Sequence, residues 1–306
     1  MEFREFIKSD TNFDFVGKMK IAVACSLAVI IIGLASIVWH KGLNYGIDFA
    51  GGTLVQIKFQ KELSADAIRG AFKSIGLENS IIQSFGTNEV VIRTTELPSD
   101  QRGLSGKIED ALTAVYGKDS FEIRRVEAVG PKVGSDLTKK AILAILFSWI
   151  GMLIYVGVRF EFRYAVGGIL ALIHDVLITV GIFSLLNKEF DLQIVAALLT
   201  IIGYSINDTI VIYDRIRENV RKNVKQSLRD IINLSVNQTL SRTILTSLTV
   251  LLVVVILFFF GGAVIHDFSF ALLIGVIVGS YSTIFIASPI VLTLERAKPS
   301  RMKRNK

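Results

Sequence analysis

The sequence predicts a polytopic α-helical membrane protein with six transmembrane helices and one α+β domain outside the membrane. Of its 306 residues, 51% are hydrophobic, and the mean hydropathy of +0.54 exceeds that of soluble globular domains. The apolar residues form six blocks, each long enough to cross a hydrocarbon core about 30 Å thick. The single cysteine, Cys25, lies inside the first block. These observations exclude a soluble enzyme, a disordered chain and a disulfide-stapled secreted domain.

Six ranges are expected to span the membrane. The first, 19–39, is longer than a signal-peptide core of about 7–15 residues, so we interpret it as a retained helix. The other five are expected at 141–158, 164–186, 193–213, 239–260 and 268–294, which together make a five-helix transmembrane domain over 141–294. The last span contains Pro289, which a bundle tolerates because neighbouring helices satisfy the freed backbone groups.

Lysine and arginine in the short loops predict the orientation. The loop 214–238 and the tail 295–306 each carry six basic residues, whereas the loops near 187–192 and 261–267 carry only Lys188. We therefore expect a multi-pass protein of the cytoplasmic membrane with segment 1–18, loop 214–238 and tail 295–306 in the cytosol. This topology explains the net charge of +7, so no nucleic-acid partner is expected.

The loop 214–238 also carries apolar residues at helical spacing. They are Ile216, Val220, Val224, Leu228 and Ile231. The spacing predicts an amphipathic helix that lies on the inner membrane surface and joins the fourth and fifth spans.

Residues 40–140 have soluble composition and form the expected extracytoplasmic (periplasmic) domain. Segment 54–60 alternates apolar and polar residues as a strand does, and Ser64 is a candidate N-cap for a helix over 64–76. Two strands, 81–84 and 90–94, flank a hairpin turn at 86–88. A helix over 99–117, with Leu104, Ile108, Leu112 and Val115 on its apolar face, and a strand over 121–126 complete the domain. The order β-α-β-β-α-β is the ferredoxin-like pattern.

Nothing in this domain indicates catalysis. The segment Gly103–Lys107 lacks the spacing of a phosphate-binding loop and follows no strand. We therefore expect a binding or structural module, with no catalytic residue, metal or cofactor.

Charged side chains inside membrane helices are costly, so a functional role is the default hypothesis. Asp175 lies near the middle of the third span beside His174, and Asp208 lies roughly 8 Å from the cytosolic end of the fourth. Arg242 opens the fifth span. Because consecutive spans are antiparallel, Arg242 and Asp208 can lie at similar depth. The residues alone leave two interpretations open, a static ion pair or a group that carries protons, and their separation decides between them.

The fourth span also carries a stripe of small and polar residues on one face. It consists of Thr200, Gly203, Tyr204 and Asn207. In the sixth span, Gly275 and Gly279 have the spacing of close helix packing. The proton pathway that we predict comprises Asp208, Arg242, Asn207, Asp175, His174 and Thr200.

Several motifs, taken together, resemble the SecD/SecF protein-export family. Just after the first span stands Gly46-Ile47-Asp48-Phe49-Ala50-Gly51-Gly52-Thr53, and just before the second stands Val129-Gly130-Pro131-Lys132-Val133-Gly134. The blocks 205–209, 214–219 and 237–243 are similar to SecF members in particular, and His174-Asp175 fits their third span. The resemblance covers nearly the whole chain in order. In the external domain, the residues that match the family's motif are Gly46, Asp48, Gly51, Gly52 and Thr53.

This resemblance implies a partner, an energy source and a task. Family members of this kind pair with SecD in an arrangement like that of the resistance-nodulation-division transporters, and the pair works beside the SecYEG channel on translocating preproteins. The proton motive force is expected to drive late steps of translocation. The family's charged positions of proton passage match Asp208 and Arg242, and a SecD carboxylate would complete the set. Membrane lipid is the remaining expected contact.

Two other functions compete with export. A small-molecule proton antiporter of the same superfamily would usually need twelve spans, so six spans favour a half-unit. An intramembrane aspartyl protease would use Asp175 and Asp208, but it needs a glycine-containing motif around the second aspartate. Here Asp208 follows Ser205-Ile206-Asn207.

Overall fold

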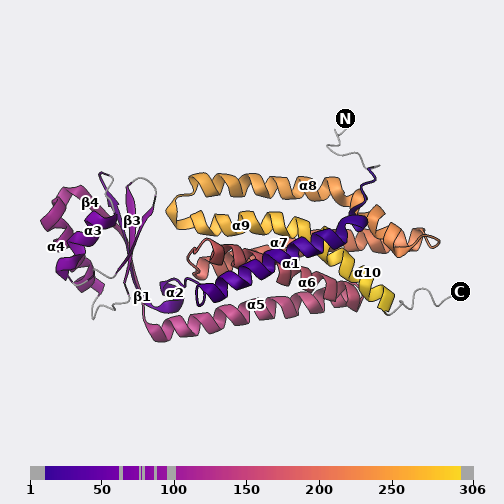
Figure 1. Cartoon of the computed structure of the whole chain (residues 1–306), viewed down its shortest axis with the longest axis horizontal. Helices are drawn as coiled ribbons and strands as arrows, with labels where there is room; N and C mark the ends of the chain where they lie inside the picture. The colour runs from indigo at the N-terminus through magenta and orange to yellow at the C-terminus, as the bar shows by residue number, and fades with distance from the viewer. Residues whose placement is uncertain are drawn as a thin grey trace. The chain divides into compact units, whose positions relative to one another are not determined.

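The chain folds into two compact units (Figure 1). The computed structural model describes residues 11–61, 65–75, 77, 80–85, 88–94 and 101–297. The membrane unit comprises residues 1–44, 143–189 and 193–306, and the sheet unit comprises residues 45–142 and 190–192. The sheet unit thus covers most of the predicted domain 40–140, but it begins at residue 45, ends at residue 142 and includes three residues from the connection between the third and fourth spans.

The sheet unit has the predicted ferredoxin-like order. Its strands are β1 (Gly52–Phe59), β2 (Ile81–Phe85), β3 (Glu89–Thr94) and β4 (Phe121–Val129). They form one sheet in the order β2-β3-β1-β4, in which all neighbours are antiparallel. The helices α3 (Ala65–Phe72) and α4 (Gln101–Tyr116) both lie on one face of the sheet (Figure 1). The short helices are α2 (Ile47–Ala50), η1 (Lys73–Ile75) and η2 (Lys118–Ser120).

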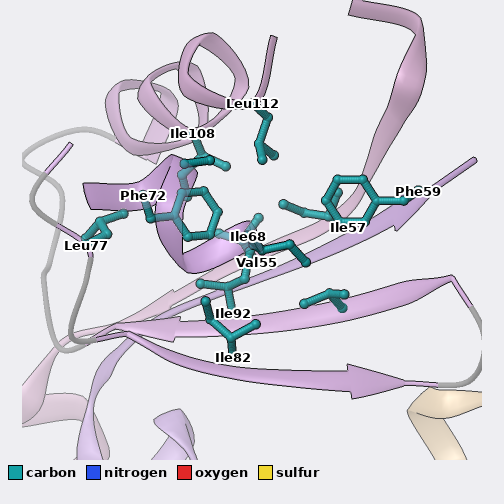
Figure 2. Close-up of a cluster of buried hydrophobic side chains, with 12 residues drawn as sticks. Val55, Ile57, Phe59, Ile68, Phe72, Leu77, Ile82, Ile92, Ile108 and Leu112 are labelled. Atoms are coloured by element: carbon teal, nitrogen blue, oxygen red, sulfur yellow. The ribbon is translucent and has the colours of Figure 1, made fainter. Parts of the chain in front are cut away.

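The core of the sheet unit lies between this face of the sheet and the two helices. In β1, Val55, Ile57 and Phe59 are buried, as the alternation predicts. Figure 2 shows these side chains pointing toward Ile68 and Phe72 of α3 and toward Ile108 and Leu112 of α4. Burial of this contiguous apolar cluster stabilises the unit, because each fully buried large side chain contributes about 1.5–3 kcal/mol.

The predicted apolar face of the second helix needs one correction. Val115, in the last turn of α4, is 57% exposed. Its neighbour Tyr116 packs against the core instead, with its ring 6.0 Å from that of Phe59. The predicted N-cap Ser64 and the hairpin residues Gly86 and Thr87 lie outside the described residues, although β2 and β3 do pair antiparallel as predicted.

Within the described residues, six helical segments are long and apolar enough to cross a membrane, as predicted. Five of them are α1 (Phe15–Trp39), α5 (Pro131–Arg159), α6 (Phe162–Leu185), α7 (Leu192–Lys222) and α8 (Leu228–Phe260). The sixth, Val264–Glu295, consists of α9 (Ala263–Ser282), the π-helical turn η3 (Thr283–Ala287) and α10 (Ser288–Ala297). The π-turn ends two residues before Pro289, which cannot donate a backbone hydrogen bond.

The predicted amphipathic surface helix is wrong. Its apolar stripe is divided between the end of α7 and the start of α8, and the chain between Lys222 and Leu228 is not helical. Ser227 caps α8 by accepting a hydrogen bond from the Asp230 N–H (3.2 Å). Hydropathy shows where apolar residues lie, whereas capping residues decide where a helix begins. Helix α5 likewise begins before its apolar block, at Pro131 rather than at residue 141, and proline is favoured at the first position of a helix.

Three spans occupy the centre of the membrane unit. Each span has a most apolar stretch. In α6, α7 and the sixth span, more than half of that stretch is buried inside the protein, whereas in α1, α5 and α8 less than a fifth is buried. Close packing joins α7 to α9 as predicted, because a Cβ on Gly275 would lie 2.2 Å from Ile201 Cγ1 and one on Gly279 would lie 3.1 Å from Ser205 Cβ.

Candidate functional site

Asp208 lies on α7 with its side chain almost fully enclosed. The residue is 5% exposed, and its Oδ2 atom is buried without a hydrogen-bond partner. Leaving a carboxylate oxygen unpaired in an apolar environment costs free energy, and intramembrane acids are therefore usually functional.

The neighbours of Asp208 come from α8. Arg242 acts on it electrostatically, and the hydroxyls of Thr246 and Ser247 lie beside its carboxyl group. We call these four residues the Asp208 site. Arg242 itself is exposed, and the ion pairs found within the described residues do not include one between Asp208 and Arg242. The structure thus brings the two predicted charges near each other without a direct contact.

A chain of hydroxyl groups continues from this site across three helices. Tyr204 donates to Ser247 Oγ (3.1 Å), and Ser247 shares a hydrogen bond with Ser280 (2.7 Å). Thr246 donates to the backbone oxygen of Arg242 (3.0 Å). Ser247 thus links the Asp208 site to Tyr204 of α7 and to Ser280 of α9.

Thr246, Ser247 and Ser280 were missed by the sequence reasoning. The sequence could have predicted two of them. Thr246 and Ser247 follow Arg242 by four and five residues, a spacing that places them near the same face of a helix.

Asp175 lies on α6 in a different environment, with 0% exposure and partners for both carboxyl oxygens. Oδ1 is 3.0 Å from His174 Nδ1. Oδ2 accepts from Ser205 Oγ of α7 (2.7 Å) and from Ser282 Oγ of α9 (2.9 Å). We call these four residues the Asp175 cluster. It joins the three central spans by hydrogen bonds, a common means of helix association in membranes.

His174 extends this cluster toward α1. Its Nε2 atom is buried without a partner, and its ring stacks on Tyr281 with centroids 6.2 Å apart. Tyr281 in turn donates to the Ala22 oxygen of α1 (2.7 Å). The predicted pair of His174 and Asp175 is therefore real, but it lies in a polar network separate from the Asp208 site.

The other predicted residues of α7 face outward. Thr200, Gly203 and Asn207 are exposed in this chain, and the Thr200 hydroxyl donates to the Ala196 oxygen (2.8 Å). Gly203, Tyr204 and Asn207 line a groove of about 810 Å³ between α7 and α5. Thr200, Gly203 and Asn207 thus lie on an exposed surface of α7, whereas Tyr204 of the same stripe is half-buried and reaches Ser247 of α8.

The blocks 214–219 and 237–243 contact each other and connect α7 to α8. Gln238 Oε1 accepts from Arg215 Nε and from Asn219 Nδ2, at 2.7 Å each. Asn237 Oδ1 accepts from the Phe13 N–H (2.8 Å), which holds the segment before α1 against α8. Most residues of the two blocks that are named here thus connect helices to each other. Arg242 differs from them, because it is the charged residue that lies near Asp208.

The motif at 46–53 lies in the sheet unit. Asp48 Oδ2 accepts from the Leu192 N–H (3.0 Å), and Thr53 is fully buried in β1. Gly51 has φ +76°, which favours glycine, and a Cβ there would lie 3.2 Å from Pro131. The two external motifs, 46–53 and 129–134, therefore pack against each other.

The chemistry available to these residues is proton binding. Within the described part of the chain, no group of three or more His, Cys, Asp or Glu side chains could hold a metal ion. The two membrane aspartates also share no hydrogen bond in the described network, unlike the paired carboxyls of an aspartyl protease. Asp208 is the acid with an unpaired oxygen, beside an arginine that stays charged.

Comparison with family models gives two matches. Residues 107–297 match "Protein export membrane protein SecD/SecF, C-terminal", and residues 37–62 match "SecD/SecF GG Motif". The second match includes the whole of the motif at 46–53.

Comparison with curated proteins gives relatives along nearly the whole chain. The chain is 51% identical over 294 residues to protein translocase subunit SecF of Magnetococcus marinus, covering 95% of this chain and 94% of that protein. It is 47% identical over 300 residues to the SecF subunit of Calditerrivibrio nitroreducens, covering 96% and 98%. It is 45% identical over 292 residues to that of Vibrio alginolyticus, covering 95% and 92%.

Two solved structures are similar in fold and sequence. The crystal structure of SecDF from Thermus thermophilus, a translocon-associated membrane protein, superposes with a TM-score of 0.85 at 37% identity, covering 94% of this chain and 39% of that one. SecDF in a super-membrane-facing form gives a TM-score of 0.71 at 35% identity, covering 98% and 41%. This chain thus spans about two fifths of each SecDF chain.

Proposed function

Because the chain belongs to the SecD/SecF protein-export family, we propose that it couples proton movement across the membrane to late steps of preprotein translocation, with Asp208 as the group that binds and releases the proton. It has the SecF role in the protein translocase and is a multi-pass membrane protein that works with SecD. The proton, its site, the SecYEG channel and the preprotein substrate are parts of the proposal.

One observation carries this proposal. Asp208 Oδ2 is buried and unpaired, next to an arginine on α8. An ionised carboxylate gains from the arginine charge, whereas a protonated carboxyl group loses this attraction but is less costly to bury. The two forms of Asp208 therefore favour different separations of α7 and α8, which is the requirement for a proton-driven movement.

The exposed residues around the site support a partner subunit there. Arg242 and Asn207 are exposed in this chain, and polar groups facing lipid at membrane depth are unfavourable. We infer that SecD covers this surface and supplies the carboxylate that pairs with Arg242. The protein then acts as a motor subunit in the cytoplasmic membrane with cytosolic termini, and not as an enzyme.

The test is export in cells depleted of the protein. Processing and release of a pulse-labelled secreted protein are followed after rescue with wild type, Asp208→Asn, Arg242→Met or the control Asp230→Asn, an exposed acid of α8. We expect wild type and Asp230→Asn to restore export and the other two to fail at normal abundance. Full rescue by Asp208→Asn would contradict the proposal.

A further inference from the structure

The segment that follows α1 contacts the connection between α6 and α7. The Gly46 N–H donates to the Phe190 oxygen (2.9 Å), and Tyr45 forms a parallel β-bridge with Phe190. The rings of Tyr45, Phe49 and Phe190 pack together, with centroids 6.0–6.4 Å apart. All these residues belong to the sheet unit, so the three residues 190–192 are packed and hydrogen-bonded into it.

Asp48 adds a polar contact at the end of this segment. Its Oδ2 atom accepts from the N–H of Leu192 (3.0 Å), which is the first residue of α7. The first N–H groups of a helix have no partner within the helix. A carboxylate placed there both satisfies a donor and interacts favourably with the helix dipole.

The backbone around Asp48 packs closely against the start of α5. Gly134, in the first turn of α5, has no side chain, and a Cβ there would lie 2.7 Å from the Phe49 oxygen. A Cβ on Gly51 would lie 3.2 Å from Pro131, and Gly52 is the first residue of β1. The position of Asp48 is therefore fixed by the backbone that follows it, which packs against the start of α5 and continues into β1.

We infer that Asp48 is a positioning residue that fixes the start of α7 to the sheet unit by a hydrogen bond. Protonation of Asp208 would then displace the sheet unit through α7, and displacement of the sheet unit would in turn alter the surroundings of Asp208. Leu192 and Asp208 belong to one uninterrupted helix, about 24 Å apart at 1.5 Å per residue. This inference rests on the proposed function, since it assigns to the motif at 46–53 the mechanical link that a proton-driven motor requires.

The experiment uses inverted membrane vesicles that contain the full chain with its native partners. Two quantities are measured in the same vesicles: proton influx, with a pH-sensitive dye, and the increase in preprotein translocation caused by a proton gradient. The variants are Asp48→Ala, Asp48→Asn, Asp208→Asn and the control Asp136→Ala, which removes an exposed acid of the sheet unit that forms an ion pair with Lys140 (2.8 Å).

We expect Asp48→Ala to retain proton influx and to lose the gradient-dependent increase in translocation. Asp48→Asn, which keeps an acceptor oxygen, and Asp136→Ala are expected to retain both. In hydrogen exchange, the amides at the start of α7 should exchange about 2- to 30-fold faster in Asp48→Ala, the range that loss of a helix cap implies. A merely structural defect would lower influx and translocation together and increase exchange throughout the sheet unit.

The outcomes separate this inference from the proposed function. If Asp48→Ala keeps its gradient response while Asp208→Asn loses it, the inference is wrong and the proposed function stands. If Asp48→Ala loses influx together with protection throughout the sheet unit, the inference is also wrong. If Asp208→Asn keeps both influx and gradient response, the proposed function is wrong, and the inference fails with it.

Discussion

Asp175 and Asp208 are both acids in central membrane helices, yet their surroundings differ. Asp175 is fully buried, and both its oxygens have partners, drawn from α6, α7 and α9. Asp208 has a buried oxygen without a partner and lies beside the exposed Arg242 of α8. The comparison teaches that burial of an acid in a membrane helix does not by itself indicate proton transport. We propose that the Asp175 cluster stabilises the bundle and that the Asp208 site carries the proton.

The largest effect on stability is expected from Asp175→Ala. The change removes the shared partner of Ser205 Oγ, Ser282 Oγ and His174 Nδ1 in a closed interior, and Ser282 Oγ keeps only the Gly279 backbone oxygen (3.1 Å). We expect the free energy of unfolding to fall by about 2–4 kcal/mol, because three interactions are lost together. Titration with SDS of the purified protein measures this, with Asp208→Ala as the matched control. Equal losses in both variants would remove the distinction between the two acids.

A smaller loss is expected when either serine of the Asp175 cluster is removed. Ser205→Ala and Ser282→Ala each delete one hydrogen bond to Asp175 Oδ2, and each should lower the free energy of unfolding by about 0.6–1.7 kcal/mol. A double-mutant cycle with Asp175→Asn measures the coupling. Strict additivity between the serines and Asp175 would show that the cluster does not act as a unit.

Still smaller stability effects are expected from Ser247→Ala. Ser247 lies on the partly exposed α8 and bonds to Tyr204 and Ser280, so the free energy of unfolding should change by about 1 kcal/mol or less. Proton influx into vesicles should nevertheless slow, because this hydroxyl lies next to Asp208. Thr249→Ala, which removes an exposed hydroxyl of the same helix, serves as the control. Unchanged influx in Ser247→Ala would exclude the hydroxyl chain from the proton path.

Much of the fold could be predicted from the sequence, because hydropathy and alternation report local burial directly. Val55, Ile57 and Phe59 are buried in β1 as their spacing predicts, and the six spans occur where the apolar blocks lie. The helix ends could not be predicted in this way, since α8 begins at Leu228, directly after the cap residue Ser227 and well before its apolar stretch.

The candidate site was predictable only in part. The antiparallel order of consecutive spans brings Asp208 near Arg242, as expected. The different partners of Asp175 and Asp208 depend on which faces of α7, α8 and α9 meet, and this is decided by close contacts such as that between Ile201 and Gly275. The attachment of residues 190–192 to the sheet unit likewise depends on tertiary contacts of Asp48 and Phe190, which no local pattern encodes.

The central claim is that Asp208, and not Asp175, is the acid that moves protons. Proton influx into inverted vesicles tests it most directly with two isosteric variants, Asp208→Asn and Asp175→Asn, compared at equal protein abundance. Our account predicts that influx is lost in Asp208→Asn and retained in Asp175→Asn. Influx that persists in Asp208→Asn, or that disappears in a normally abundant Asp175→Asn, would contradict it.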